Sequence, residues 1–282
     1  MDVGDHEGQY SHFQFKYLPV HIIGLCGFVL HALLLNAFAK DPLKCFRNSA
    51  TYVVANLAVS DLAISLCGPY LDWFDHWSLD MIGVIIFSAS LLTIILIATD
   101  RFLMVVYPLK HKFLVNGKKI IIFISLIWSL SSLNGIQETL LAPVNIYFFS
   151  FGTYLGVTIM LVTGSLYVLT LISLRKQTKN LALDDASGSN HSQATRLLRE
   201  KQFVRTILLV ACIAVIGTAP FIIVRYTLTM TTVHLTLTQN ITWCFVVALF
   251  YFTFAINPLI YFVRLPRYRK TFYILYLRKQ SN

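Results

Sequence analysis

Residues 81–101 read MIGVIIFSASLLTIILIATDR, and this stretch decides the fold. Residues 81–99 contain no charged side chain, and Asp100 and Arg101 then follow together. The hydrocarbon core of a bilayer is about 30 Å thick, which a helix crosses with roughly 20 apolar residues, since each residue adds about 1.5 Å. The stretch therefore predicts a membrane-spanning helix with a charged pair at one end.

The rest of the chain contains six more runs of this kind. The seven apolar runs take up most of the 282 residues and lie at 18–39, 49–71, 78–106, 119–141, 146–173, 203–229 and 239–263. Backbone groups in lipid must satisfy their own hydrogen bonds, so continuous runs of this length indicate helices rather than barrel strands. We therefore expect an all-α membrane protein, a seven-transmembrane helix bundle with a C-terminal amphipathic surface helix.

Composition supports the same fold class. The chain is 56% hydrophobic and only 13% charged, whereas a soluble domain carries about a quarter charged residues. The seven runs leave no room for a separate soluble catalytic domain, so we do not expect an enzyme. The five cysteines form no close-spaced pair, which argues against a zinc motif and a disulfide framework.

The distribution of positive charge predicts the orientation in the membrane. Of the 23 basic residues, 21 fall in or beside the connections after runs one, three and five and in the C-terminal tail. Basic residues collect on the cytoplasmic side, so the N-terminus is expected outside. This bias also accounts for the net charge of +10 without a nucleic-acid partner. We expect an extracellular N-terminus at 1–17, a seven-transmembrane domain at 18–263, and a cytoplasmic surface helix and short tail at 264–282.

Four short motifs stand out on these runs. They are NLAVSD at 56–61, DRF at 100–102, Trp128 and NPLIY at 257–261. A charge inside a span is expensive, so Asp61 marks a functional site by default. In the last motif Pro258 leaves one backbone carbonyl without its helical hydrogen bond, and the side chain of Asn257 can donate a hydrogen bond to that carbonyl.

Together these motifs resemble the rhodopsin-like (class A) family of G-protein-coupled receptors, over residues 18–278. The resemblance implies a multi-pass plasma-membrane receptor that binds an extracellular ligand and activates a heterotrimeric G protein by outward movement of helix six. Two alternatives stay open: a constitutively active or nonsignalling family member, and a small membrane transporter. A transporter would need a chain of intramembrane ionisable residues or inverted repeats, and only Asp61 is deeply placed.

The resemblance also assigns roles in the activation switch. Arg101 would be held by Asp100 and Glu200 at rest, and Leu109 would fill an apolar notch on the G protein. Helix six would bend at Pro220, and two tyrosine hydroxyls would meet through water once it moves. The residues of this switch are Asp100, Arg101, Leu109, Tyr167, Glu200, Pro220, Asn257, Pro258 and Tyr261.

A buried sodium site is implied in the same way. Asp61, Ser90 and Asn257 would line it, because hard cations prefer oxygen ligands. Sodium is the one cofactor considered, as an allosteric modulator. The positions of two further family partners are occupied by Thr218 and Thr253, which puts the site in doubt. In helix one, either Asn36 or His31 takes the place of the family's asparagine.

The expected ligand pocket excludes two ligand classes. Gly83 replaces the aspartate of amine receptors and Tyr251 the lysine of opsins, so a classical monoamine and retinal are disfavoured. The remaining lining is apolar and aromatic with a few charges, and suits an amphipathic small molecule, a lipid or a short peptide. Its expected residues are Trp73, Asp80, Gly83, Phe87, Glu138, Phe221, Arg225, Trp243 and Val247. Any one of these aromatic side chains could instead contact lipid.

Several features depart from the family pattern or add to it. Helix six reads GTAP at 217–220 and lacks the usual tryptophan, so Phe221 becomes the nearest trigger. A short outer loop without cysteine gives a weak likeness to the melanocortin, lysophospholipid and cannabinoid branches. Asn240 begins a glycosylation triplet close to the membrane, where modification is disfavoured. The polar stretch 177–195 is expected to be a loop, and arrestin binding would use its hydroxyl groups.

Overall fold

The computed structural model describes residues 18–44, 46, 49–71, 77–141, 146–184, 191–230 and 237–277. This part of the chain is built from helices. They are α2 (Leu18–Lys40), α3 (Ser49–Leu71), α4 (Trp77–Val106), α5 (Pro108–Leu114), α6 (Gly117–Ile136), α7 (Ile146–Asp184), α8 (His191–Met230), α9 (Leu237–Ala255), α10 (Asn257–Arg264) and α11 (Pro266–Phe272), with the π-helical turns η1 (Gln137–Leu141) and η3 (Tyr273–Leu277).

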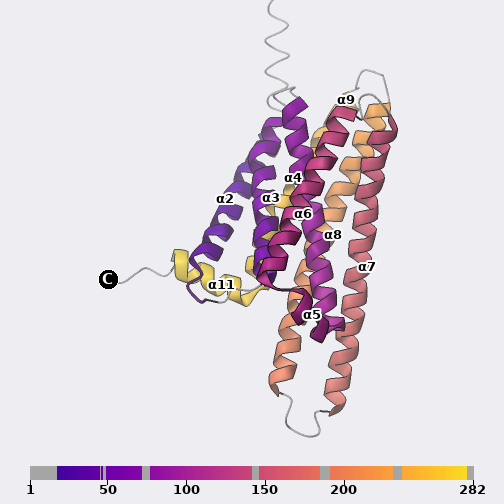
Figure 1. Ribbon diagram of the computed structural model, residues 1–282. Helices are drawn as coiled ribbons and strands as arrows, with labels where there is room; N and C mark the ends of the chain where they lie inside the picture. The colour runs from indigo at the N-terminus through magenta and orange to yellow at the C-terminus, as the bar shows by residue number, and fades with distance from the viewer. Residues whose placement is uncertain are drawn as a thin grey trace, which may run out of the picture.

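The seven expected spans are confirmed. Seven of the described helices are long and apolar enough to cross a membrane. In Figure 1 the long helices run side by side as one bundle, α11 lies crosswise to them, and α7 and α8 project beyond the others at the lower end. The chain is therefore a multi-pass membrane protein. The expected N-terminal segment 1–17 lies outside the described residues.

Burial in the bundle follows the rule for a protein dissolved in lipid. Large apolar side chains such as Leu25, Leu161 and Phe245 point outward, while His31, Ser90 and Thr93 are buried. Lipid tails are as apolar as leucine, so helices gain nothing by hiding leucine and gain most by packing closely and pairing polar groups. At Gly27 a Cβ would lie 2.6 Å from Ser65 Oγ, so the glycine lets α2 approach α3.

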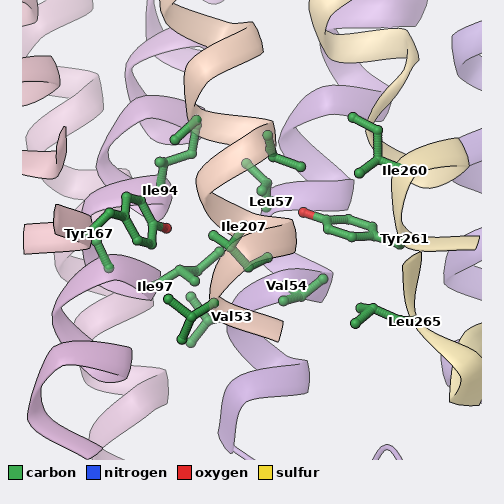
Figure 2. Close-up of a cluster of buried hydrophobic side chains, with 14 of the residues drawn as sticks. Val53, Val54, Leu57, Ile94, Ile97, Tyr167, Ile207, Ile260, Tyr261 and Leu265 are labelled. Carbon is green, nitrogen blue, oxygen red and sulfur yellow. The ribbon is translucent and has the colours of Figure 1, made fainter. Parts of the chain in front are cut away.

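Two apolar clusters fill the interior at different depths. Figure 2 shows the inner cluster, in which side chains of α3, α4, α7, α8 and α10 meet around Ile207. The outer cluster includes Ile64, Ile86 and Phe254. Asp61 lies on α3 between Leu57 of the inner cluster and Ile64 of the outer one. The bundle therefore holds one buried polar layer between two apolar ones.

The structure differs from the sequence expectations in two places. The stretch 177–195 is not a loop over its described part, because α7 continues to Asp184 and α8 begins at His191. Extending an existing helix costs far less than starting one, and this outweighs a polar composition. The seventh span is two helices, α9 and α10, divided at Ile256, just before Pro258. Proline lacks the N–H that would continue the ladder.

Candidate functional site

The polar layer at mid-bundle is centred on Asp61, whose side chain is buried. Ser90 Oγ on α4 donates to its Oδ1 at 2.8 Å, and Asn257 Nδ2 on α10 donates to its Oδ2 at 2.7 Å. His31 Nε2 on α2 lies 3.7 Å from the same Oδ2. Three helices far apart in sequence therefore meet at one carboxylate of α3.

The structure decides between the two residues expected to replace the helix-one asparagine. Asn36 faces away from Asp61 and donates to the Tyr276 hydroxyl at 2.7 Å, and that hydroxyl donates to the Leu33 carbonyl. His31 faces Asp61 instead. His31 therefore occupies the expected position, while Asn36 fastens the C-terminal surface segment to α2.

The arrangement around Asp61 was tested against a bound sodium ion. Sodium needs several oxygen lone pairs turned toward one point. Ser90 and Asn257 instead turn hydrogens toward the carboxylate, and His31 presents a ring nitrogen. Thr253, at one of the further partner positions, donates to the Phe250 carbonyl. In this conformation the donated hydrogens fit an ionised carboxylate better than a bound sodium ion, although Asn257 Oδ1 is a buried oxygen without a partner among the described residues.

A second polar link connects α3, α4 and α6. Asn56 Nδ2 donates to Thr93 Oγ1 at 2.8 Å, and Trp128 Nε1 donates to Asn56 Oδ1 at 3.0 Å. Each of these side chains thereby pairs a polar group that lipid could not satisfy. The Asn56 and Trp128 motif positions are thus explained as a structural tie.

The inner end of α4 carries the charged pair. Arg101 Nε donates to Asp100 Oδ2 at 2.8 Å, and a second, shorter contact joins Arg101 Nη2 to the same oxygen. His111 Nε2 on α5 lies 2.8 Å from Asp100 Oδ1. Arg101 is only 6% exposed. Asp100 therefore holds the guanidinium inside the bundle and at the same time fastens α5 to α4.

Helix α8 contacts Arg101 through a residue that sequence reasoning missed. The guanidinium carbon lies 4.9 Å from the ring centroid of Phe203, a distance typical of cation–π attraction. Glu200, the expected acidic partner, lies on α8, but its side chain is outside the described residues. An aromatic residue at that helical position carries no charge, so a search for ion pairs passes it over.

Tyr167 and Tyr261 lie on opposite sides of the inner cluster. In Figure 2 their hydroxyls point toward one another, with Ile207 drawn in the space between. Both side chains are buried, and neither hydroxyl has a hydrogen-bond partner within the described part of the chain. An unpaired buried hydroxyl costs free energy. These two groups are therefore placed for partners that this conformation does not provide.

Helix α5 presents an apolar surface beside the charged pair. Leu109 is 75% exposed and Phe113 80% exposed. Side chains of this size on the end of the bundle, away from the lipid belt, suggest a surface that a partner covers. Leu109 lies where the family resemblance places its contact with the G protein.

The outer half of the bundle holds a cavity of about 170 Å³. Seven of the nine expected pocket residues line it, from α4, α8 and α9: Asp80, Gly83, Phe87, Phe221, Arg225, Trp243 and Val247. Phe250 and Tyr251 also line it, on the same face of α9 as Val247. Sequence reasoning missed Phe250 and considered Tyr251 only as the position of the opsin lysine. The floor is aromatic, because the Phe221 ring stacks on Phe250 at 4.3 Å and on Trp243 at 5.6 Å.

The remaining expected pocket residues lie elsewhere. Glu138 is on η1 and does not line the cavity, although it interacts electrostatically with Arg225. A π-helical turn shifts the register of the residues that follow it, which sequence periodicity does not reveal. Trp73 lies outside the described residues. Asn240, the glycosylation candidate, is half-buried near the start of α9.

A larger cavity of about 260 Å³ was not expected from the sequence. It lies between α4, α7 and α8 and has an almost wholly apolar lining that includes Leu91, Met160 and Leu208. Apolar side chains at these positions are equally typical of helix packing and of lipid contact. The sequence therefore carried no signal that could have found it.

Comparison with known proteins identifies the class. The family model of the 7 transmembrane receptor (rhodopsin family) matches residues 32–261, which is most of the chain. The chain therefore belongs to the rhodopsin family of seven-transmembrane receptors. Neuromedin-U receptor 2 of Homo sapiens is 23% identical, with 91% of this chain and 69% of the relative covered. An allatostatin-A receptor of Bombyx mori is 30% identical, over 38% of this chain and 32% of the relative.

Another relative belongs to a different receptor type. The alpha-1A adrenergic receptor of Oryzias latipes is 25% identical, over 37% of this chain and 25% of the relative. All three relatives are receptors. The chain described here has seven helices able to span a membrane, and its sequence contains the DRF and NPLIY motifs. The chain is thus a G-protein-coupled receptor by family.

Proposed function

We propose that this receptor sits in the plasma membrane with its N-terminus outside and binds an extracellular ligand in the outer cavity. Ligand binding moves the inner end of α8 outward, and the opened inner surface activates a heterotrimeric G protein. The positive-inside distribution of Lys and Arg supports the orientation.

The observation that carries the proposal is the contact between Arg101 and Phe203. It joins the buried guanidinium of α4 to the inner part of α8, on the side where α8 projects beyond the bundle (Figure 1). A cation–π contact is short-ranged, so a small outward movement of α8 removes it. Arg101 would then keep Asp100 as its charged partner and could turn toward a bound G protein.

Phe221 is placed to transmit the movement from the cavity. It follows Pro220, the proline inside α8, and it touches both Trp243 and Phe250 in the cavity floor. A helix bends most readily at proline, because one hydrogen bond of the ladder is missing there. A ligand that displaces the Phe221 ring therefore acts directly on the hinge of α8.

The ligand we propose is amphipathic: a small molecule, a lipid or a short peptide. The aromatic floor favours an apolar group, and Asp80 and Arg225 place opposite charges in the same lining. The cavity is smaller than the roughly 300–1,000 Å³ typical of ligand sites, so it would hold a small ligand or one end of a longer one. Two relatives are named for neuromedin U and allatostatin A, while the adrenergic relative shows that ligand type varies within the family.

A second candidate function is that of a receptor with high activity in the absence of ligand. Thr218 stands at the position of the family's helix-six tryptophan, and its buried hydroxyl has no hydrogen-bond partner among the described residues. A small side chain there removes a bulky group that would resist movement of α8. Arrestin binding is a further proposal, and its candidate serines at 187, 189 and 192 have side chains outside the described residues.

The test is nucleotide exchange on purified G proteins of several subtypes, with and without a library of amphipathic ligands. We expect Arg101→Ala to lower exchange by at least about tenfold, a loss of about 1.4 kcal/mol of differential interaction. Arg264→Ala, an exposed arginine at the end of α10, serves as the control for the loss of one inner positive charge. Unchanged exchange in Arg101→Ala at equal surface expression would overturn the role given to this residue.

A further inference from the structure

Asp61 and His31 form a deeply buried pair that has no role in the proposed signalling mechanism. Each side chain is only 1% exposed, and their closest atoms are 3.7 Å apart. A carboxylate so far from water costs several kcal/mol unless a positive charge or several hydrogen bonds compensate it. The question is which group supplies the positive charge.

The hydrogen bonds around Asp61 suit an ionised carboxylate. Ser90 donates to one carboxylate oxygen and Asn257 to the other, so both oxygens act as acceptors. These two donated hydrogens lower the cost of burying a carboxylate charge. An ionised Asp61 has two good hydrogen bonds but still needs a counter-charge.

The position of His31 shows that it can supply this charge. Its Nδ1 lies 2.8 Å from the carbonyl oxygen of Gly27, which can only accept, so Nδ1 carries a hydrogen. This contact turns Nε2 toward Asp61 Oδ2. A lone pair on Nε2 would face a negative carboxylate, whereas a second ring hydrogen would be attracted to it. Among the described residues, His31 is the basic group that lies within 4.0 Å of Asp61.

We propose that His31 is the resident counter-charge of Asp61 and takes the place that sodium would hold in this layer. Ser90 and Asn257 support this by donating hydrogens to the carboxylate, so both of its oxygens are already engaged from α4 and α10. The receptor would then be insensitive to sodium, because its cation is part of α2. The sodium site expected from the sequence becomes the alternative that the experiment decides.

The test compares melting temperatures of the purified full-length receptor in matched sodium chloride and N-methyl-D-glucamine chloride. The native protein should melt at the same temperature in both salts, within about 1 °C. His31→Asn removes the charge and offers an amide oxygen, so it should gain a saturable sodium-dependent rise of about 5 °C. His21→Asn, on the same helix, is the matched control and should behave as the native protein does.

Two results overturn the proposal: a saturable sodium-dependent rise in the native protein, or a folded His31→Asn variant that lacks one. If His31→Asn does not fold, Asp61→Asn and the double variant replace it. A resident ion pair predicts that His31→Asn rescues part of the melting temperature lost in Asp61→Asn, and purely additive losses would contradict it. These readouts do not involve a G protein, so they are independent of the proposed function.

Discussion

Two regions of this receptor contain the same pair of residue types, an aspartate beside a histidine, at different depths. At mid-bundle Asp61 faces His31, whose side chain is 1% exposed. At the inner end Asp100 faces His111, whose side chain is 17% exposed, and Asp100 also holds Arg101. The deep pair has to be complete within the protein, whereas water and a permanent cation support the rim pair. The same two residue types therefore form a structural tie in one region and part of a releasable contact in the other.

The largest effect is expected from the deep pair. His31→Ala leaves Asp61 buried without its partner, which costs about 3–5 kcal/mol when one side of a buried ion pair is removed. Thermal unfolding of the purified receptor would measure the loss. His21→Ala, on the same helix, should change stability far less. A loss below about 1 kcal/mol would mean that Asp61 is compensated by another group.

The next effect concerns the contact between the rim region and α8. Phe203→Ala removes a cation–π attraction of about 0.5–2 kcal/mol that holds Arg101 against α8. Ligand-independent nucleotide exchange should therefore rise, by about two- to thirtyfold. Phe245→Ala, which removes a lipid-facing ring of α9, should leave exchange unchanged. Equal or lower exchange in Phe203→Ala would show that this contact does not restrain α8.

A smaller effect of opposite sign is expected at Tyr167. Its hydroxyl is buried without a hydrogen-bond partner among the described residues, so Tyr167→Phe should raise the free energy of unfolding by up to about 1 kcal/mol. The same substitution should lower ligand-stimulated exchange, because the hydroxyl is needed only once α8 has moved. A variant that is destabilised at rest would show that the hydroxyl already has a partner.

The smallest effect is expected at the rim histidine. His111→Ala should cost less than about 1 kcal/mol of stability, because a partly exposed ion pair is screened by water. Ligand-stimulated exchange should fall by less than about fivefold, since α5 keeps Leu109 exposed but loses its tether to Asp100. If His111→Ala were as destabilising as His31→Ala, burial would not be the cause of the difference between the two regions.

The motif residues assigned to the activation switch could be placed along the spans from the sequence, and their roles in activation stay predictions. Asp100, Arg101, Asn257 and Tyr261 could be found from their motifs, because each is fixed in sequence relative to a span. Phe203 and His111 could not be found from the sequence, because only their contacts with Arg101 and Asp100 in the structure mark them. Glu138 was expected in the cavity lining, but it lies on the π-helical turn η1 and is not among the residues that line the cavity.

The sequence by itself determined that the chain crosses the membrane seven times. Exposing charge to lipid is costly, so each span must be a long apolar run, and such runs can be identified along the sequence alone. The tertiary structure alone decided that His31 rather than Asn36 faces Asp61, and that Phe203 touches Arg101. Successive residues point about 100° apart around a helix, so a small rotation exchanges one neighbour for another. Those rotations depend on how seven helices pack together, and no single span contains that information.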